Sequence, residues 1–195
     1  MLCRHAVRVN DYKKAMRATR ELHAGAMDYN SRMTLPDFFL KQKQAIRARS
    51  EDVFRLLRPE HLGWSPGNGA LNIGEMLRHL WVSEEGVRRV ALDGNFAYYE
   101  KRIPGGLPAV LGGAASSVEE ELRQIARAHQ ETLAAASKLR EEEWDKERVN
   151  DAIGFRRKVS VILFGINEHE VHHRAQLMTY LRMLGTPAPE PFAKR

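Results

Sequence analysis

The fold is decided by residues 159–184, which read VSVILFGINEHEVHHRAQLMTYLRML and are followed by Gly185 and Pro187. At about 100° per residue, the apolar side chains of this stretch return to one face of a helix, within roughly 40° of Ile166. The positions on that face are Val159, Ile162, Ile166, Leu177, Tyr180 and Leu184. Gly and Pro after the last apolar position are typical of a helix end. The spacing therefore predicts a long helix over 159–184 with one narrow core-facing seam.

Two histidines share this seam. His173 falls inside it and His169 at its edge, one helical turn away, whereas His172 lies well off it. A histidine in a protein core loses its hydration, which costs free energy unless its ring nitrogens find partners. An i, i+4 pair on one helix face brings two imidazoles close enough to bind one cation. The pair predicts a metal site, and a pair of hydrogen-bonded core histidines is the alternative.

Three further stretches have apolar residues at helical spacing. They cover about 36–57, 72–92 and 118–142. Each follows a residue that favours the N-cap position, and these are Thr34, Asn72 and Ser117. No stretch shows the strict alternation of a half-buried strand, apart from a brief extended piece near 155–161. We therefore predict an all-α protein, a bundle of four long helices.

The connections between these helices are rich in Pro and Gly. Residues 59–70 form one such loop, in which we expect Trp64 to anchor on the core. Residues 94–116 form a much longer connection. A connection of this length is often functional, or crosses from one end of a bundle to the other. We expect it to form part of the mouth of a site.

A third histidine lies on the second predicted helix. His79 sits to the side of the apolar stripe and shares its face with small residues, Ser83 and Gly86. Three histidines from two facing helices form a metal site of the kind that bundle cores offer. Neutral imidazole suits Zn, Ni, Cu or Fe better than Mg or Ca, and we expect Zn or Ni first, with Fe or Mn as alternatives. Three protein ligands leave a position for water or substrate, as in catalytic sites.

Two readings of the neighbouring residues stay open. The letters His169-Glu170-x-x-His173 fit the H-E-x-x-H motif, with Glu170 as general base, but little helix remains downstream for a third ligand. Other side chains can orient a ligand, reach the metal as a fourth ligand (His129) or bind substrate, and a solvated glutamate, a core histidine or a helix contact is the alternative for each. These candidates are Glu75, His129, Glu170 and Arg174.

Composition places the chain among ordinary globular proteins. A length of 195 residues suits one domain, and the single cysteine, Cys3, excludes an intramolecular disulfide. No run of 18 or more apolar residues predicts a membrane span, and the N-terminus has no apolar core of a secretory signal. We therefore expect a cytoplasmic protein in a reducing compartment, without a membrane partner.

The net charge of +6 is unevenly distributed. Residues 1–49 hold eleven Lys or Arg and four Asp or Glu, whereas the remainder of the chain has a net charge of −1. The segment with the motifs is thus nearly neutral, and we do not expect nucleic acid to be the main partner. We expect residues 1–32 to be an N-terminal extension, with one short helix over Asp11–Met27 or little order, and residues 33–195 to form the bundle domain. Met33 is an alternative natural start.

Three pieces of the sequence together resemble the DinB/YfiT-like superfamily over about residues 34–190. They are Trp64-Ser-Pro66, Asn72-Ile-Gly-Glu-Met-Leu-Arg-His-Leu80, and HEVHHRAQL at 169–177 followed by YLRMLG at 180–185. The resemblance implies an up-down-down-up four-helix bundle that binds a divalent metal through His79, His169 and His173. Some relatives are transferases or isomerases that use mycothiol, bacillithiol or glutathione, and many have no assigned activity.

From these observations we expect a metal-dependent hydrolase or a thiol-dependent transferase that acts on a small molecule. The metal would activate a water or a low-molecular-weight thiol by lowering its pKa. The alternative is a metal-binding or stress-associated bundle without turnover, for which we expect a homodimer. A weaker alternative is nucleic-acid binding through the basic N-terminal part.

Overall fold

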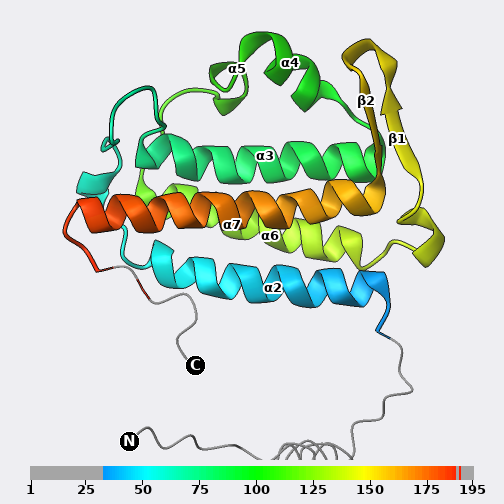
Figure 1. Cartoon of the computed structure of the whole chain (residues 1–195), viewed down its shortest axis with the longest axis horizontal. Helices are drawn as coiled ribbons and strands as arrows, with labels where there is room; N and C mark the ends of the chain where they lie inside the picture. Colours follow the sequence, from blue (N-terminus) through cyan, green and yellow to red (C-terminus); the bar gives the residue numbers. More distant parts are fainter. Residues whose placement is uncertain (1–32, 188, 190–195) are drawn as a thin grey trace, which may run out of the picture. The chain divides into compact units, whose positions relative to one another are not determined.

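The computed structural model describes residues 33–187 and 189. The helix predicted over Asp11–Met27 lies outside the described residues. Four long helices form a bundle, as Figure 1 shows. They are α2 (Leu35–Phe54), α3 (Ile73–Asp93), α6 (Val118–Ala136) and α7 (Val159–Met183). This confirms the all-α bundle.

The helices follow an up-down-down-up order. Helices α3 and α6 run in one direction, and α2 and α7 run in the other (Figure 1). Helix α3 packs against α6 and α7, and α2 packs against the same two helices. Consequently α2 lies diagonally opposite α3, and the crossover between α3 and α6 must return the chain to the end where α3 began.

The predicted N-caps are all present. The Thr34 hydroxyl accepts the N–H of Asp37, and the Ser117 hydroxyl accepts the N–H of Glu120. At α3 the Asn72 side chain accepts the N–H of Glu75, whose carboxylate accepts the N–H of Asn72 at 2.9 Å. These bonds satisfy donors that the first turn of a helix leaves open.

Two predicted helices end earlier than expected. Helix α2 ends at Phe54 and not at residue 57, and α6 ends at Ala136 and not at residue 142. After α6 the chain forms a short 3₁₀ turn (Glu141–Glu143) and inserts the Trp144 ring into the core, where it packs edge-on against Phe39. Burial of this large ring favours a turn over a further helical turn.

The two connections around the bundle contain more structure than predicted. The long connection holds two short helices, α4 (Ala97–Gly105) and α5 (Pro108–Leu111). Ahead of α7, strand β1 (Glu147–Asn150) pairs antiparallel with β2 (Phe155–Lys158). The predicted extended piece near 155–161 is therefore shorter, because α7 already begins at Val159, and it has a partner that the sequence did not indicate.

The bundle core is apolar at both ends and polar in its middle. The cluster at the end where α3 begins includes Phe54, Ile73, Leu77, Ile125 and Leu181. The cluster at the opposite end includes Phe39, Val90, Ala136, Trp144 and Leu163. Buried polar side chains from all four helices lie at or near the change from one cluster to the other along each helix: Lys43, Arg47, His79, Ser83, Glu84, His129, Glu170 and His173. A buried polar layer of this size needs internal partners for its charges.

Helix α4 packs closely against α3 at Gly86. A methyl group at Gly86 would lie 2.7 Å from Cβ of Tyr98 and would overlap the Tyr98 ring. The absence of a side chain at this position lets the ring pack directly on the α3 backbone. Gly86 therefore fixes the distance between α4 and the bundle.

We expect Gly86→Ala to lower the free energy of unfolding by about 1–3 kcal/mol, because the added methyl forces Tyr98 and α4 outward. Gly165→Ala is the matched control, since Gly165 is also helical and has no heavy atom within 4 Å of an added Cβ. That variant should be unchanged or more stable by about 0.5–1 kcal/mol. Urea unfolding of both variants checks the prediction, and equal changes in the two would contradict it.

Candidate metal centre

Three imidazoles from two helices converge at one point. His79 comes from α3, and His169 and His173 come from adjacent turns of α7. The Nε2 atom of His169 lies 2.9 Å from Nε2 of His79 and 3.1 Å from Nε2 of His173. One ring nitrogen of each residue lies within 4.8 Å of the other two. This spacing allows one ion to be shared by all three.

Hydrogen bonds on the far side of two rings fix their orientation. His173 Nδ1 lies 2.7 Å from the side-chain oxygen of Gln176, which can only accept, so this nitrogen carries the proton. The Nε2 lone pair of His173 is then free to face the centre. His79 Nδ1 bonds to the Ser83 hydroxyl at 2.9 Å, and Ser83 in turn bonds to the Tyr98 hydroxyl at 2.8 Å. Such outer partners orient metal-ligating histidines.

The three rings are neutral at physiological pH. Burial, with the neighbouring imidazoles, lowers the pKa of His169 to about 2 and that of His79 to about 4. Burial also lowers the pKa of His173, against the opposing effect of the Gln176 bond. Neutral imidazole is the form that binds metal ions. The histidine triad (His79, His169 and His173) therefore fits a divalent metal in charge state, geometry and outer hydrogen bonding.

Beside the triad lies a buried charge cluster of four side chains, Lys43, Arg47, Glu84 and Glu170. Each is at most 6% exposed. Lys43 Nζ lies 2.9 Å from Glu84 Oε1, and Arg47 Nη2 lies 3.0 Å from Glu170 Oε2. Cross pairs at 3.4 and 3.8 Å complete the cluster. Two cations on α2 thus match one carboxylate on α3 and one on α7, and the cluster has no net charge.

The other predicted site residues lie apart from the triad's ligand atoms. The Glu75 carboxylate closes the cap of α3, and the Glu170 carboxylate belongs to the buried charge cluster. Arg174 donates to the carbonyl of Ile46 at 3.1 Å. His129 is buried, and it is not one of the residues whose ligand atoms converge. None of these four lines the cavity described below.

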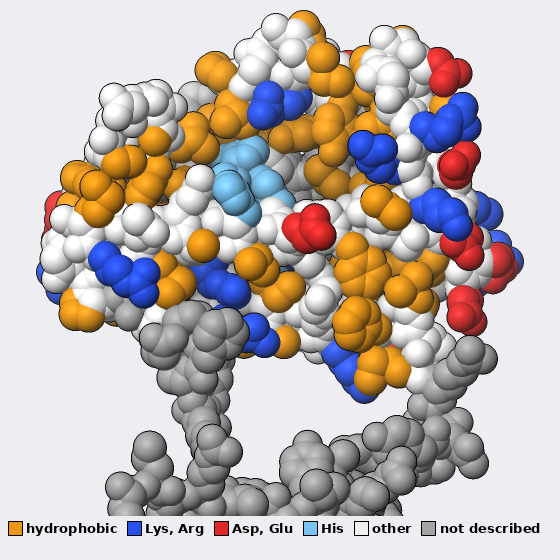
Figure 2. Space-filling view, in the orientation of Figure 1, with side chains coloured by type: hydrophobic (Ala, Val, Ile, Leu, Met, Phe, Trp, Pro, Cys, Tyr) orange, Lys and Arg blue, Asp and Glu red, His pale blue; other side chains and the backbone are white. Residues whose placement is uncertain are grey.

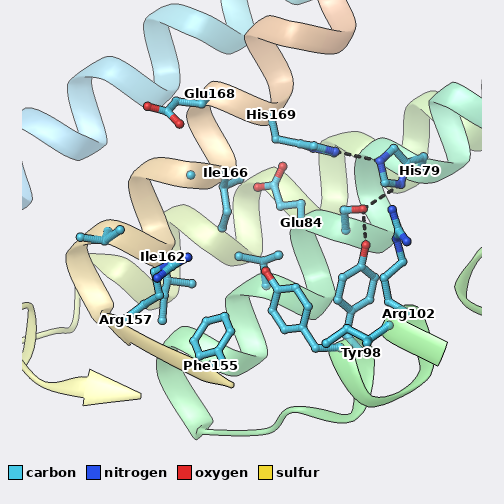
Figure 3. Close-up of a pocket in the computed structure, with 16 residues that line it drawn as sticks. His79, Glu84, Tyr98, Arg102, Phe155, Arg157, Ile162, Ile166, Glu168 and His169 are labelled. Carbon is cyan, nitrogen blue, oxygen red and sulfur yellow. Dashed lines mark hydrogen bonds between the residues drawn. The ribbon is translucent and has the colours of Figure 1, made fainter. Parts of the chain in front are cut away.

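A cavity of about 590 Å³ opens from the triad between α3, α4, β2 and α7 (Figure 3). Its lining includes His79 and His169 at one end, and its walls carry Val87, Tyr98, Tyr99, Phe155, Ile162 and Ile166. Two guanidinium groups, Arg102 and Arg157, also face it. Figure 2 shows the histidine side chains at the surface in a hollow beneath the α4–α5 segment, surrounded largely by apolar side chains.

Several of these residues were not singled out from the sequence. Lys43 and Arg47 follow Phe39 at four-residue intervals, which is core spacing, but charged helical residues usually face solvent. Gln176 follows His173 by three residues, a spacing that allows contact along a helix. Tyr98 gave no signal, because its contact with Ser83 depends on how α4 folds back over α3.

Comparison with known proteins agrees with this architecture. A model of the DinB superfamily matches residues 42–177, and the chain therefore belongs to this superfamily. It is 24% identical over 150 residues to the uncharacterized protein YjoA of Bacillus subtilis strain 168, a match that covers 75% of this chain and 86% of YjoA.

Solved structures show the same fold. The crystal structure of the DinB-like YjoA from Bacillus subtilis matches with a TM-score of 0.62 at 19% identity, covering 80% of this chain and 99% of that one. A DinB-like protein from Bacillus cereus ATCC 10987 matches with a TM-score of 0.54 at 18% identity, covering 78% and 94%. Among the described residues, no helix is both long and apolar enough to cross a membrane.

His129 should make stability depend on pH. Burial, together with Arg47 and Lys43, lowers its pKa from 6.5 to about 3 in the folded protein. As the pH falls below about 6.5, the unfolded chain takes up a proton that the folded chain refuses, so the free energy of unfolding decreases. We expect His129→Gln to reduce this loss of stability between pH 7 and 5. The slope of the free energy of unfolding against pH should fall by an amount that corresponds to at most about one proton taken up on unfolding. Urea unfolding with chelator at each pH measures it, and identical pH slopes would contradict the assignment.

Removing one carboxylate of the buried charge cluster should be strongly destabilising. Glu170→Gln leaves Lys43 and Arg47 facing a single negative charge, and we expect a loss of about 3–5 kcal/mol in the free energy of unfolding. Glu168→Gln is the control, because Glu168 is exposed on the same helix, and it should change stability by less than about 0.5 kcal/mol. Chemical unfolding compares the two, and a similar small change in both would show that the cluster contributes little.

Proposed function

We propose that this protein binds one divalent metal ion, Zn or Ni first, through His79, His169 and His173. We further propose that it is a metal-dependent hydrolase or a thiol-dependent transferase acting on a small molecule. The observation that carries the proposal is the convergence of three neutral Nε2 atoms at the end of a cavity. Three ligands and an adjacent cavity are typical of catalytic rather than structural metal sites.

The residues divide into three roles. The triad would hold the ion, and the bound ion supplies the Lewis acidity that makes a water or a thiol nucleophilic at neutral pH. Gln176 and Ser83 orient two of the rings through their Nδ1 atoms. The aromatic and aliphatic walls of the cavity exclude bulk water and hold the apolar part of a substrate.

A metal-binding protein without turnover is the second candidate. One observation favours it: the carboxylates that line the cavity are poorly placed as general bases. Glu84 is paired with Lys43 and Arg47, which lower its pKa against the effect of burial, and the Glu168 carboxylate points away from His169 in Figure 3. In an enzyme of this form, proton transfer would depend on solvent or on the substrate itself.

Metal content tests the site. Untagged protein should contain about one Zn or Ni per chain, and His169→Ala should lose most of it. His172→Ala is the matched control, because His172 is exposed on the same helix and outside the triad. Elemental analysis of the three purified proteins checks the result. Full occupancy in His169→Ala, or equal loss in both variants, would exclude the triad as the ligand set.

Turnover separates the two candidates. Wild-type protein would be assayed against small esters and amides, and for consumption of mycothiol, bacillithiol or glutathione with electrophilic acceptors, with and without chelator. An enzyme should lose activity with chelator and regain it on addition of the metal. Metal at full occupancy without turnover across these reactions would favour the non-catalytic protein.

A further inference from the structure

Arg102 is a charged group without a counter-ion at the metal end of the cavity. It lies on α4, is partly buried and faces the cavity close to His79, as Figure 3 shows. Within the part of the chain that the structure describes, no carboxylate forms an ion pair with it. By contrast, Arg78, Arg88 and Arg89 of the neighbouring helix α3 each pair with a glutamate. A partly buried guanidinium gains most from an anionic partner, and here none comes from the described part of the protein.

The rest of the lining does not neutralise Arg102. Glu84 is occupied by the buried charge cluster, and Glu168 points away from Arg102 in Figure 3. Arg157 adds a second positive charge across the cavity, 5.9 Å above the centre of the Phe155 ring. Its side chain is exposed, so it lies at the rim. Of the two guanidinium groups that line the cavity, Arg102 is therefore the one that lies close to His79 (Figure 3).

The walls define the rest of the ligand. Tyr98, Tyr99 and Phe155 present aromatic surface, and Val87, Ile162 and Ile166 present aliphatic surface. A volume of about 590 Å³ accommodates a small organic molecule. A body that is apolar or aromatic fits these walls, with its anionic group toward Arg102.

We propose that the substrate of this site is a small carboxylic acid with an apolar or aromatic body, whose carboxylate is bound by the Arg102 guanidinium beside the histidine triad. The planar fork of arginine matches a carboxylate through two parallel hydrogen bonds. A single partly buried guanidinium suits one carboxylate better than a phosphate dianion, which would need more donors. This inference deepens the proposed function and rests on it, because it places the acid group next to the reacting centre.

Binding of matched probes tests the proposal. Full-length protein with its metal would be titrated calorimetrically with 3-phenylpropanoate, 4-phenylbutanoate and hexanoate, and with the amide of each. We expect wild-type protein to bind at least one acid about tenfold or more tightly than its amide. Arg102→Gln should weaken acid binding about 10- to 100-fold, the loss of a charged hydrogen-bond pair, and change amide binding less than about twofold.

Two further variants keep the test sharp. Lys101→Gln removes the same charge from an exposed neighbour on α4 and should leave acid binding unchanged. If Arg102→Gln fails to fold, Arg102→Lys takes its place in the test. Lysine keeps the charge but lacks the planar fork, so this variant should bind acids more weakly than wild type. Equal weakening of acid and amide, equal effects of Arg102→Gln and Lys101→Gln, or no preference for any acid would each overturn the proposal.

Repeating the titrations on chelator-treated protein separates this proposal from the metal site. Acid binding that depends on Arg102 in both metal-loaded and metal-free protein supports the carboxylate site, whatever the fate of the metal proposal. Acid binding that needs metal but is unchanged in Arg102→Gln would mean that the carboxylate is a metal ligand, and would overturn the role of Arg102 while leaving the metal site intact.

Discussion

The buried charge cluster is the constraint on which the middle of this bundle depends. Charges in a protein interior lose their hydration, so each of the four must face its partners at close range. Lys43 and Arg47 on α2 can satisfy both carboxylates only when α3 and α7 present Glu84 and Glu170 at the same height. The histidine triad then follows from sequence neighbourhood, because His169 and His173 flank Glu170, and His79 lies little more than one turn before Glu84. A buried ion-pair set adds little net stability compared with apolar packing, but it strongly disfavours a helix shifted along its axis.

Division of the core into two apolar ends and a polar middle lets one small domain combine stability with a site. The end clusters contain large, fully buried apolar side chains, including Phe39, Trp144 and Leu181. These ends supply the hydrophobic stabilisation that the middle gives up. A third buried carboxylate, Glu121, accepts hydrogen bonds from Arg78 at 3.0 Å and Trp81 at 2.7 Å, and so joins α6 to α3. The imidazoles are therefore held between helices that are fixed on both sides.

The sequence predicted those features that depend on local spacing. The seam of α7, the caps at Thr34, Asn72 and Ser117, and the helical order all follow from periodicity and turn chemistry. The polar layer could not be predicted in the same way, because the burial of Lys43 depends on Glu84, which lies 41 positions away on another helix. Periodicity indicates which face of its own helix a residue occupies, but not which residue of another helix it contacts. Helix α4 contains Pro104 and has no buried residue, so it has no apolar stripe from which a helix could be predicted. The hairpin strands are four residues each and mostly exposed, which is too short for a reliable alternation.

The path from α4 to the triad links the cavity wall with the proposed metal ligands. Tyr98 packs on the bare backbone at Gly86, and its hydroxyl reaches His79 through Ser83. The Tyr98 ring and two of the triad's imidazoles line the same cavity. The Tyr98 hydroxyl holds the Ser83 hydroxyl, which in turn bonds to His79 Nδ1, and outer partners of this kind orient metal-ligating histidines. Two hydroxyl groups thus connect the cavity wall to His79, and α4 belongs to the site together with the two long helices that carry the histidines.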